Sequence, residues 1–171
     1  TDWLGLRQPT WKLALALAPV VVLITWTTAA SLELTGFNRW LIHITETPKQ
    51  QAVVSALIET ENLWLLALLC FMAVIAAPIS EEIIFRGYLY PVAKRFATPI
   101  PAAIFSALTF AAIHYHVTAL IPLALLGLLF VLVYEWTGTI WAPIAAHVLF
   151  NAATVSIQLA SRFGRIDLPQ P

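Results

Sequence analysis

Two pairs of polar residues stand four positions apart in strongly apolar surroundings. The segment "EEIIFR" contains Glu82 and Arg86, and "HVLFN" contains His147 and Asn151. Residues four apart lie on one face of a helix, so Glu82 can form an ion pair with Arg86. Glu81 points about 100° away from Glu82 and has no local cation. The spacing indicates a structural role for Glu82 and leaves Glu81 free for chemistry.

A third segment, "FAAIH", places His114 one helical turn after Phe110. Ionisable side chains at membrane depth cost about 2.5–3.5 kcal/mol each, so we expect these side chains to face other helices. A carboxylate in apolar surroundings takes a proton from water readily, and an imidazole can share that task or protonate a leaving amine. An amide and a second imidazole can donate hydrogen bonds to an oxyanion. Together they are the groups that hydrolysis of a carbonyl compound requires.

Each of these groups also has a plainer structural interpretation. Glu82 with Arg86 can be an interfacial salt bridge, and Glu81 can face lipid headgroups. His147 with Asn151 can be an interhelical hydrogen-bonding pair. His116 follows His114 by two positions and is expected in an interfacial turn. The presence of four unusual polar positions on three segments favours the catalytic interpretation.

The composition indicates that the chain lies in a lipid bilayer. Of its 171 residues, 60% are apolar and 11% are charged, whereas soluble proteins have about 45–50% and about 25%. The mean hydropathy is +0.84. We therefore expect an integral membrane protein whose main partner is the lipid bilayer. Nine basic and nine acidic residues give no net charge, which argues against nucleic acid as a partner.

Hydrophobic patterning predicts the architecture. A hydrocarbon core of about 30 Å needs about 20 helical residues. Five segments approach that length, at residues 13–30, 62–78, 99–115, 118–134 and 139–160. A more polar stretch repeats apolar residues at helical spacing from Phe37 to Ile44, which is typical of an interfacial helix. The predicted fold is an all-α, polytopic transmembrane helical bundle with about five membrane-spanning segments plus this interfacial helix.

Local signals predict where helices begin. Ser80 is expected to cap a new helix, which places Glu81 and Glu82 in its first turn. A further helix is expected to start at Thr47–Gln50 and can continue unbroken into the second span. Repeats and linkers are absent from the sequence. We therefore expect one membrane-embedded domain over residues 1–171, with the polar motifs in a core at about 75–155.

The three polar segments, taken together, resemble a known family. "EEIIFR", "FAAIH" and "HVLFN" are similar to the motifs EExxxR, FxxxH and HxxxN of the CPBP intramembrane proteases. This family includes the type II CAAX prenyl endopeptidases and bacteriocin-processing enzymes, and it is also called the Abi family. The flanking "FRGYLYP" and "GTIWAPIAAH" resemble it too. Each motif alone is short, but three in this order on hydrophobic segments are specific.

The resemblance implies an all-helical enzyme that hydrolyses peptide bonds in or next to the bilayer. By that resemblance, Glu81 and His114 activate the water molecule. His147 and Asn151 hold the oxyanion, and Glu82 with Arg86 stabilises the site.

The family has also been described as metalloproteases, which implies Glu81, His114 and His147 as zinc ligands. These residue types suit zinc and leave one position for water. The chain lacks the HExxH helix motif, however, and Asn151 has no place in such a ligand set. No cofactor is therefore favoured, and zinc is the alternative.

The resemblance also bears on the substrate. Eukaryotic members cut after a prenylated cysteine, whereas bacterial relatives are linked to bacteriocin maturation or self-immunity. We expect a membrane-associated peptide or protein substrate, prenylated or not, and a location in a prokaryotic cell membrane. The alternative is a non-catalytic membrane immunity or scaffolding protein that binds a partner with the same polar cluster.

Overall fold

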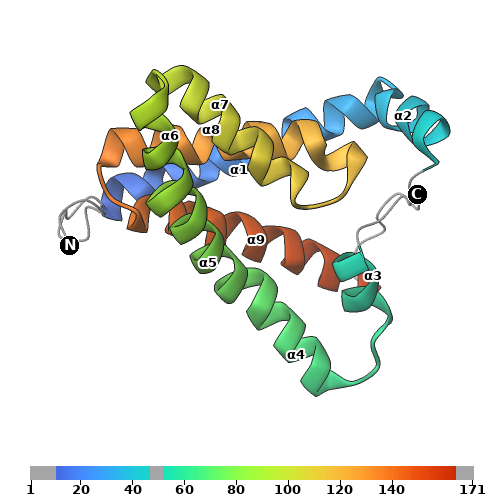
Figure 1. Ribbon diagram of the computed structural model, residues 1–171. Coiled ribbons are helices and arrows are strands. Elements are labelled where there is room, and N and C mark those ends of the chain that lie inside the picture. Colours follow the sequence, from blue (N-terminus) through green and yellow to red (C-terminus); the bar gives the residue numbers. More distant parts are fainter. Residues whose placement is uncertain (1–10, 47–51, 165–171) are drawn as a thin grey trace.

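The computed structural model describes residues 11–46 and 52–164, and these residues form helices joined by short turns, without a β-strand (Figure 1). The predicted all-α bundle is confirmed. The predicted helix start at Thr47–Gln50 lies outside the described residues. The first part of the bundle consists of α1 (Trp11–Leu34), α2 (Phe37–Thr45) and α3 (Ala52–Glu59). The last part consists of α7 (Pro99–Ala112), the 3₁₀ turn η4 (Val117–Ala119), α8 (Leu120–Thr137) and α9 (Trp141–Arg162).

One continuous helix of 34 residues runs from Leu63 to Phe96 between these two parts. Its pieces are α4 (Leu63–Phe71), the π turn η2 (Met72–Ala76), α5 (Ala77–Ile84), the π turn η3 (Phe85–Leu89) and α6 (Tyr90–Phe96). Asn62 caps its start by accepting hydrogen bonds from the backbone N–H groups of Trp64 and Leu65. Because α3 ends at Glu59, the predicted continuation of α3 into this span is wrong.

The predicted helix start at Ser80 is also wrong. The Ser80 hydroxyl bonds to the carbonyl oxygens of Ala76 and Ala77 inside the long helix. Serine can satisfy its hydroxyl within a helix in this way, so its presence does not require a helix end. Glu81 and Glu82 therefore lie in the middle of a helix and not in a first turn.

Prolines explain the two π turns of the long helix. A proline inside a regular α-helix clashes with the carbonyl four residues before it and lacks an N–H group. The N–H of Ala77, next to Pro78, bonds to Met72 O, five residues back. The N–H of Tyr90, next to Pro91, bonds in the same way to Phe85 O. The wider π turn lets the helix continue past each proline.

Within the described residues, four helices are long and apolar enough to cross a membrane: Ala16–Leu34, Leu63–Phe96, Val117–Thr137 and Trp141–Arg162. The remaining predicted segment, 99–115, forms the shorter helix Pro99–Ala112 of 14 residues. The chain is an integral membrane protein.

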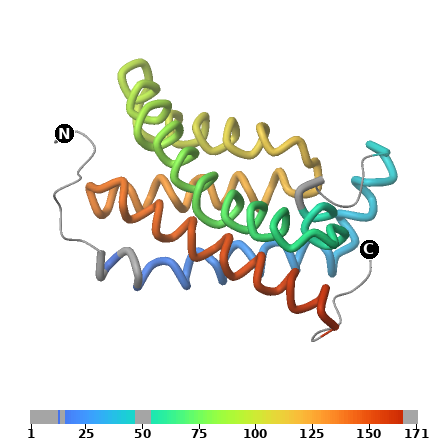
Figure 2. The backbone as a smooth tube through the Cα atoms, turned by 90° about the horizontal axis from the view of Figure 1, so that it is seen from below, coloured from blue at the N-terminus to red at the C-terminus, as the bar shows by residue number. Residues whose placement is uncertain are grey.

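The core is built where α1, α7, α8 and α9 pack together, with α5 crossing beside α9 (Figures 1 and 2). Gly127 lets α8 approach α7 closely, because a Cβ atom there would lie 3.0 Å from Ala107 Cα. Phe85, Phe110 and Phe130 fill the centre of the largest buried apolar cluster. Phe110 and Phe130 of this cluster contact Arg86 and His147.

Candidate active site

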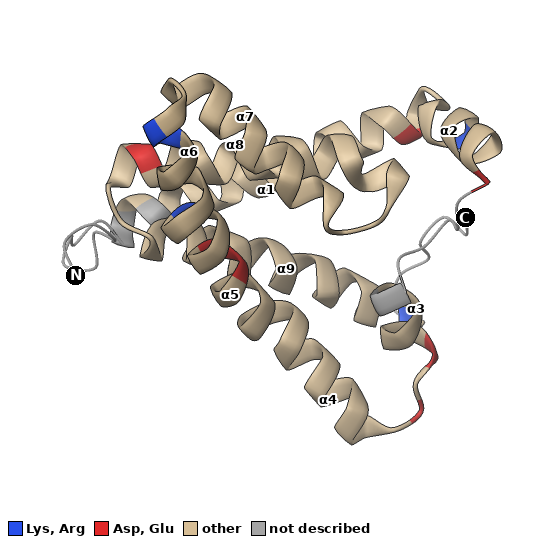
Figure 3. Ribbon diagram, viewed as in Figure 1, with Lys and Arg blue, Asp and Glu red and all other residues tan. Residues whose placement is uncertain are grey.

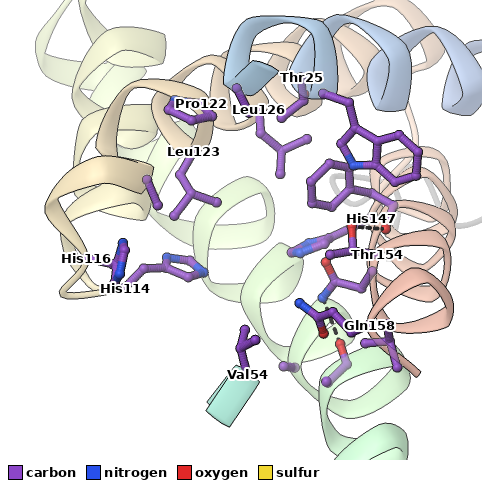
Figure 4. Close-up of a pocket in the computed structure, with 18 of the residues that line it drawn as sticks. Thr25, Val54, His114, His116, Pro122, Leu123, Leu126, His147, Thr154 and Gln158 are labelled. Atoms are coloured by element: carbon purple, nitrogen blue, oxygen red, sulfur yellow. Dashed lines mark hydrogen bonds between the residues drawn. The ribbon is translucent and has the colours of Figure 1, made fainter. Parts of the chain in front are cut away.

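Charged residues lie mostly at helix ends and in loops, but those of α5 lie inside the bundle (Figure 3). There the structure has a cavity of about 660 Å³, to which helices α1 to α5 and α7 to α9 all contribute wall residues. The wall includes all four predicted catalytic side chains: Glu81, His114, His147 and Asn151. Figure 4 shows the ring of His114 directed across the cavity toward His147. Tertiary structure thus brings together four side chains from three distant motifs.

Glu82 links two of these motifs. Its Oε1 accepts a hydrogen bond from Arg86 Nη1 at 2.9 Å and another from His147 Nδ1 at 2.9 Å. The side chains of Glu82 and Arg86 are both 0% exposed, so the interfacial salt bridge considered from the sequence is wrong. Since a carboxylate oxygen only accepts hydrogen bonds, His147 Nδ1 carries a proton. The other ring nitrogen of His147, Nε2, is then left for the cavity.

Arg86 is held from three sides. Its Nη2 donates to Gly127 O at 2.7 Å, and its guanidinium lies 5.1 Å from the Phe110 ring centroid and 5.2 Å from that of Phe130. Ring faces attract a desolvated cation, and a buried cation needs its carboxylate partner. The guanidinium group therefore fixes Glu82 relative to α8.

Glu81 faces His147 across a short gap. Its Oε2 lies 3.8 Å from His147 Nε2, which is too far for a direct hydrogen bond. That oxygen is buried and has no hydrogen-bond partner among the described residues. A water molecule can contact both atoms at once, which is the geometry that a general base requires.

His114 is oriented by its own helix. Its Nδ1 lies 2.8 Å from Phe110 O, and because a carbonyl oxygen only accepts, Nδ1 carries the proton. Nε2 of His114 is then a hydrogen-bond acceptor. The Phe110 ring lies 4.9 Å from the His114 ring and 5.8 Å from that of His147, measured between centroids. Phe110 therefore packs against both imidazoles.

Asn151 is positioned by the first π turn. Its Nδ2 donates to Ala73 O at 2.7 Å. In the π register of this turn, Ala73 O would accept from residue 78, but Pro78 has no N–H group. The proline thus frees the carbonyl that orients the Asn151 amide. One N–H of that amide is left for the cavity.

The sequence interpretation did not place His116 or Asn38 in the site, although both line the cavity. His116 was expected in an interfacial turn, whereas it is partly buried at the start of η4 and lines the cavity. Tyr115 between the two histidines has φ +50°, so the chain reverses there. This reversal lets both His114 and His116 reach the cavity. Asn38 on α2 belongs to no motif, and no signal in the sequence marked it.

The zinc alternative does not fit the side chains as they are placed. Within residues 11–46 and 52–164, no three His, Cys, Asp or Glu side chains lie close enough to hold one metal ion. His147 has Nδ1 occupied by Glu82, and its Nε2 is directed toward Glu81. We therefore derive no step through a metal.

Comparisons with known proteins agree with the motif positions. The family described as "Type II CAAX prenyl endopeptidase Rce1-like" matches residues 62–153, which contain every predicted site residue. The curated protein "Putative membrane peptidase YdiL" of Bacillus subtilis (strain 168) is 32% identical over 92 residues. The match covers 54% of this chain and 38% of the relative, so the chain spans well under half of that protein's length. No solved structure matches.

Proposed function

Because this chain belongs to the Rce1-like family of type II CAAX prenyl endopeptidases, we propose that it is an intramembrane endopeptidase. Its substrate is a membrane-associated peptide or protein, and its location is a prokaryotic cell membrane. The observation that carries the proposal is that Glu81, His114, His147 and Asn151 line one cavity inside the bundle.

Glu81 and His114 activate the water in this proposal. The unpartnered Oε2 of Glu81 takes a proton from a water molecule. His114 Nε2 accepts a hydrogen bond from the second O–H, since its Nδ1 is held by Phe110 O. The water oxygen then forms a bond to the carbonyl carbon of the substrate.

His147 and Asn151 hold the oxyanion that forms. His147 donates from Nε2 as an imidazolium, with Glu82 accepting from Nδ1. Asn151 donates its second amide N–H. Protonated His147 and Arg86 balance ionised Glu81 and Glu82.

Collapse of the tetrahedral intermediate completes the reaction. The carbon–nitrogen bond breaks and its electron pair moves to the nitrogen, which takes the proton held by Glu81. The products are a new carboxyl end and a free amine. No metal enters any of these steps.

Cleavage by Glu81→Gln protein tests the proposal. The substitution keeps the side-chain size and removes the base, so kcat should fall by about 10²–10⁴-fold. The assay uses protein in liposomes with two internally quenched peptides, one with a farnesylated cysteine near its C-terminus and one without the lipid. Glu61→Gln changes an exposed glutamate in the same way and is the matched control.

Full activity of Glu81→Gln protein would end the mechanism proposed here. Saturable binding of a probe peptide by the wild type without any cleavage product would instead support the non-catalytic alternative. Faster cleavage of the farnesylated peptide than of the peptide without the lipid would indicate a prenylated substrate.

A further inference from the structure

The cavity wall contains polar atoms that the proposed reaction does not use. Seven buried side-chain N or O atoms in the described part of the chain have no hydrogen-bond partner. Four of them belong to cavity-wall residues: Glu81, Thr25, Asn38 and His116. Glu81 has a role in the reaction. Thr25 lies on α1, whereas the elements that carry Asn38 and His116, α2 and η4, pack against each other, so Asn38 and His116 are considered as a pair.

The Asn38 amide has a defined orientation. Its Nδ2 donates to Glu33 Oε2 at 3.0 Å, and a carboxylate can only accept, so nitrogen and oxygen cannot be exchanged. The amide oxygen, Oδ1, is therefore directed away from Glu33. It is buried and has no partner. Asn38 offers the cavity one hydrogen-bond acceptor.

His116 offers the complementary group. Its Nδ1 lies 3.0 Å from Thr118 Oγ1. That hydroxyl has no other hydrogen bond among the described residues, so its proton is available for Nδ1. With the hydroxyl as donor to Nδ1, we assign the ring proton to Nε2, which is buried without a partner. His116 therefore offers the cavity one hydrogen-bond donor.

The two residues lie on neighbouring elements, because α2, which carries Asn38, packs against η4, which His116 caps. Figure 4 shows His116 beyond His114 as seen from His147, so this part of the wall adjoins the proposed reaction centre on its His114 side. One acceptor and one donor match the N–H and C=O groups of a polypeptide main chain. An extended peptide in an apolar cavity needs such partners, because its backbone groups are costly to bury unbonded.

We infer that Asn38 and His116 form a substrate-positioning subsite that binds main-chain peptide groups of the substrate. Asn38 Oδ1 accepts from a substrate N–H, and His116 Nε2 donates to a substrate C=O. The inference rests on the proposed endopeptidase function. It adds a contact that does not depend on which side chains the substrate carries. Asn38 lies outside residues 62–153, so this subsite extends beyond the family match.

Kinetics of variants test the subsite. Asn38→Leu and His116→Leu should each raise KM by about tenfold and leave kcat within about twofold, since they act on binding and not on the reacting groups. His116→Gln keeps an N–H donor and should recover most of the wild-type KM. His43→Leu removes an exposed histidine from α2 and is the matched control. Thermal unfolding of each variant confirms that it is folded.

A backbone-ester scan provides a measurement that a purely structural role would not affect. In each analogue of the cleaved probe peptide, an ester oxygen replaces one main-chain N–H. At one position of the peptide, the ester should raise the KM of the wild-type protein. The same ester peptide should not raise the KM of Asn38→Leu protein beyond its value for the all-amide peptide. An unchanged KM in both leucine variants, or additive effects at every ester position, would show that only water satisfies these atoms and would overturn the inference.

The subsite can also be tested if the protein does not cleave peptides. Should wild-type protein cleave neither probe peptide, the endopeptidase proposal falls. Binding of the same peptides to Glu81→Gln protein, measured by fluorescence anisotropy, then decides the subsite. Weaker binding in the Asn38→Leu and His116→Leu backgrounds supports it, whereas equal binding or no binding rejects it.

Discussion

Nδ1 of His147 lies 2.9 Å from Oε1 of Glu82, and 65 positions separate the two residues in the chain. The same carboxylate oxygen bonds to Arg86. The contact therefore joins the EExxxR motif on the long helix to the HxxxN motif on α9. It also fixes the proton on Nδ1 of His147 and directs Nε2 toward Glu81. A structural ion pair in this way orients a proposed catalytic side chain.

Glu82→Gln protein tests this orienting role. The amide removes the negative charge that stabilises an imidazolium at His147, so kcat/KM should fall by about 10²–10³-fold. The assay is cleavage of the probe peptides in liposomes. Wild-type kcat/KM in this variant would contradict the role given to the Glu82–His147 contact.

Arg86→Ala should act largely through stability. It leaves Glu82 buried without its guanidinium partner, which costs about 3–5 kcal/mol. The measurement is unfolding of the purified protein in detergent micelles. Arg95→Ala changes an exposed arginine on the same long helix and should alter stability by less than about 0.5 kcal/mol. An unchanged Tm for Arg86→Ala would count against the buried pair.

Pro78→Ala tests the link between the π turn and the site. Alanine restores an N–H group that competes with Asn151 for Ala73 O, so the Asn151 amide loses its fixed orientation. We expect kcat to fall by about 10–100-fold without a lower Tm, because removing a proline favours the helix. Pro91 follows the second π turn, which contributes no cavity residue. Pro91→Ala should therefore keep kcat within about twofold. Equal kcat in the two variants would remove the proposed role of Pro78.

Gly127→Ala tests the packing that supports Arg86. The new Cβ would lie 3.0 Å from Ala107 Cα, so α7 and α8 must separate, at a cost of about 1–3 kcal/mol. The shift also displaces the carbonyl that accepts from Arg86. Adding Ala107→Gly should restore part of the Tm. A Tm equal to wild type in the single variant would show that α8 moves freely at this point.

Chelation tests the preference for a metal-free mechanism. Because no three suitable ligands converge in the described part of the chain, activity should survive EDTA or 1,10-phenanthroline. Elemental analysis of the purified protein is the accompanying measurement. Activity that is lost on chelation and returns only with added zinc would favour the alternative ligand set of Glu81, His114 and His147.

Much of the site was predictable because its spacings are properties of a single helix. Glu82 and Arg86 stand four apart, as do Phe110 and His114, and any helix places such pairs on one face. Both pairs are in contact in the structure. The hydropathy of the chain likewise predicted a helical membrane bundle, since only helices satisfy their own backbone groups in hydrocarbon. Membership of the family followed from the same short motifs.

The sequence alone did not predict the contacts between distant segments. Ser80 suggested a helix start, but the helix continues through it, because a π turn tolerates the missing N–H group of the nearby Pro78. The contact of His147 with Glu82 depends on how α9 packs against α5. The position of His116 on the cavity wall depends on the chain reversal at Tyr115. Local spacing determines which residues share a face, whereas close packing of whole helices decides which faces meet.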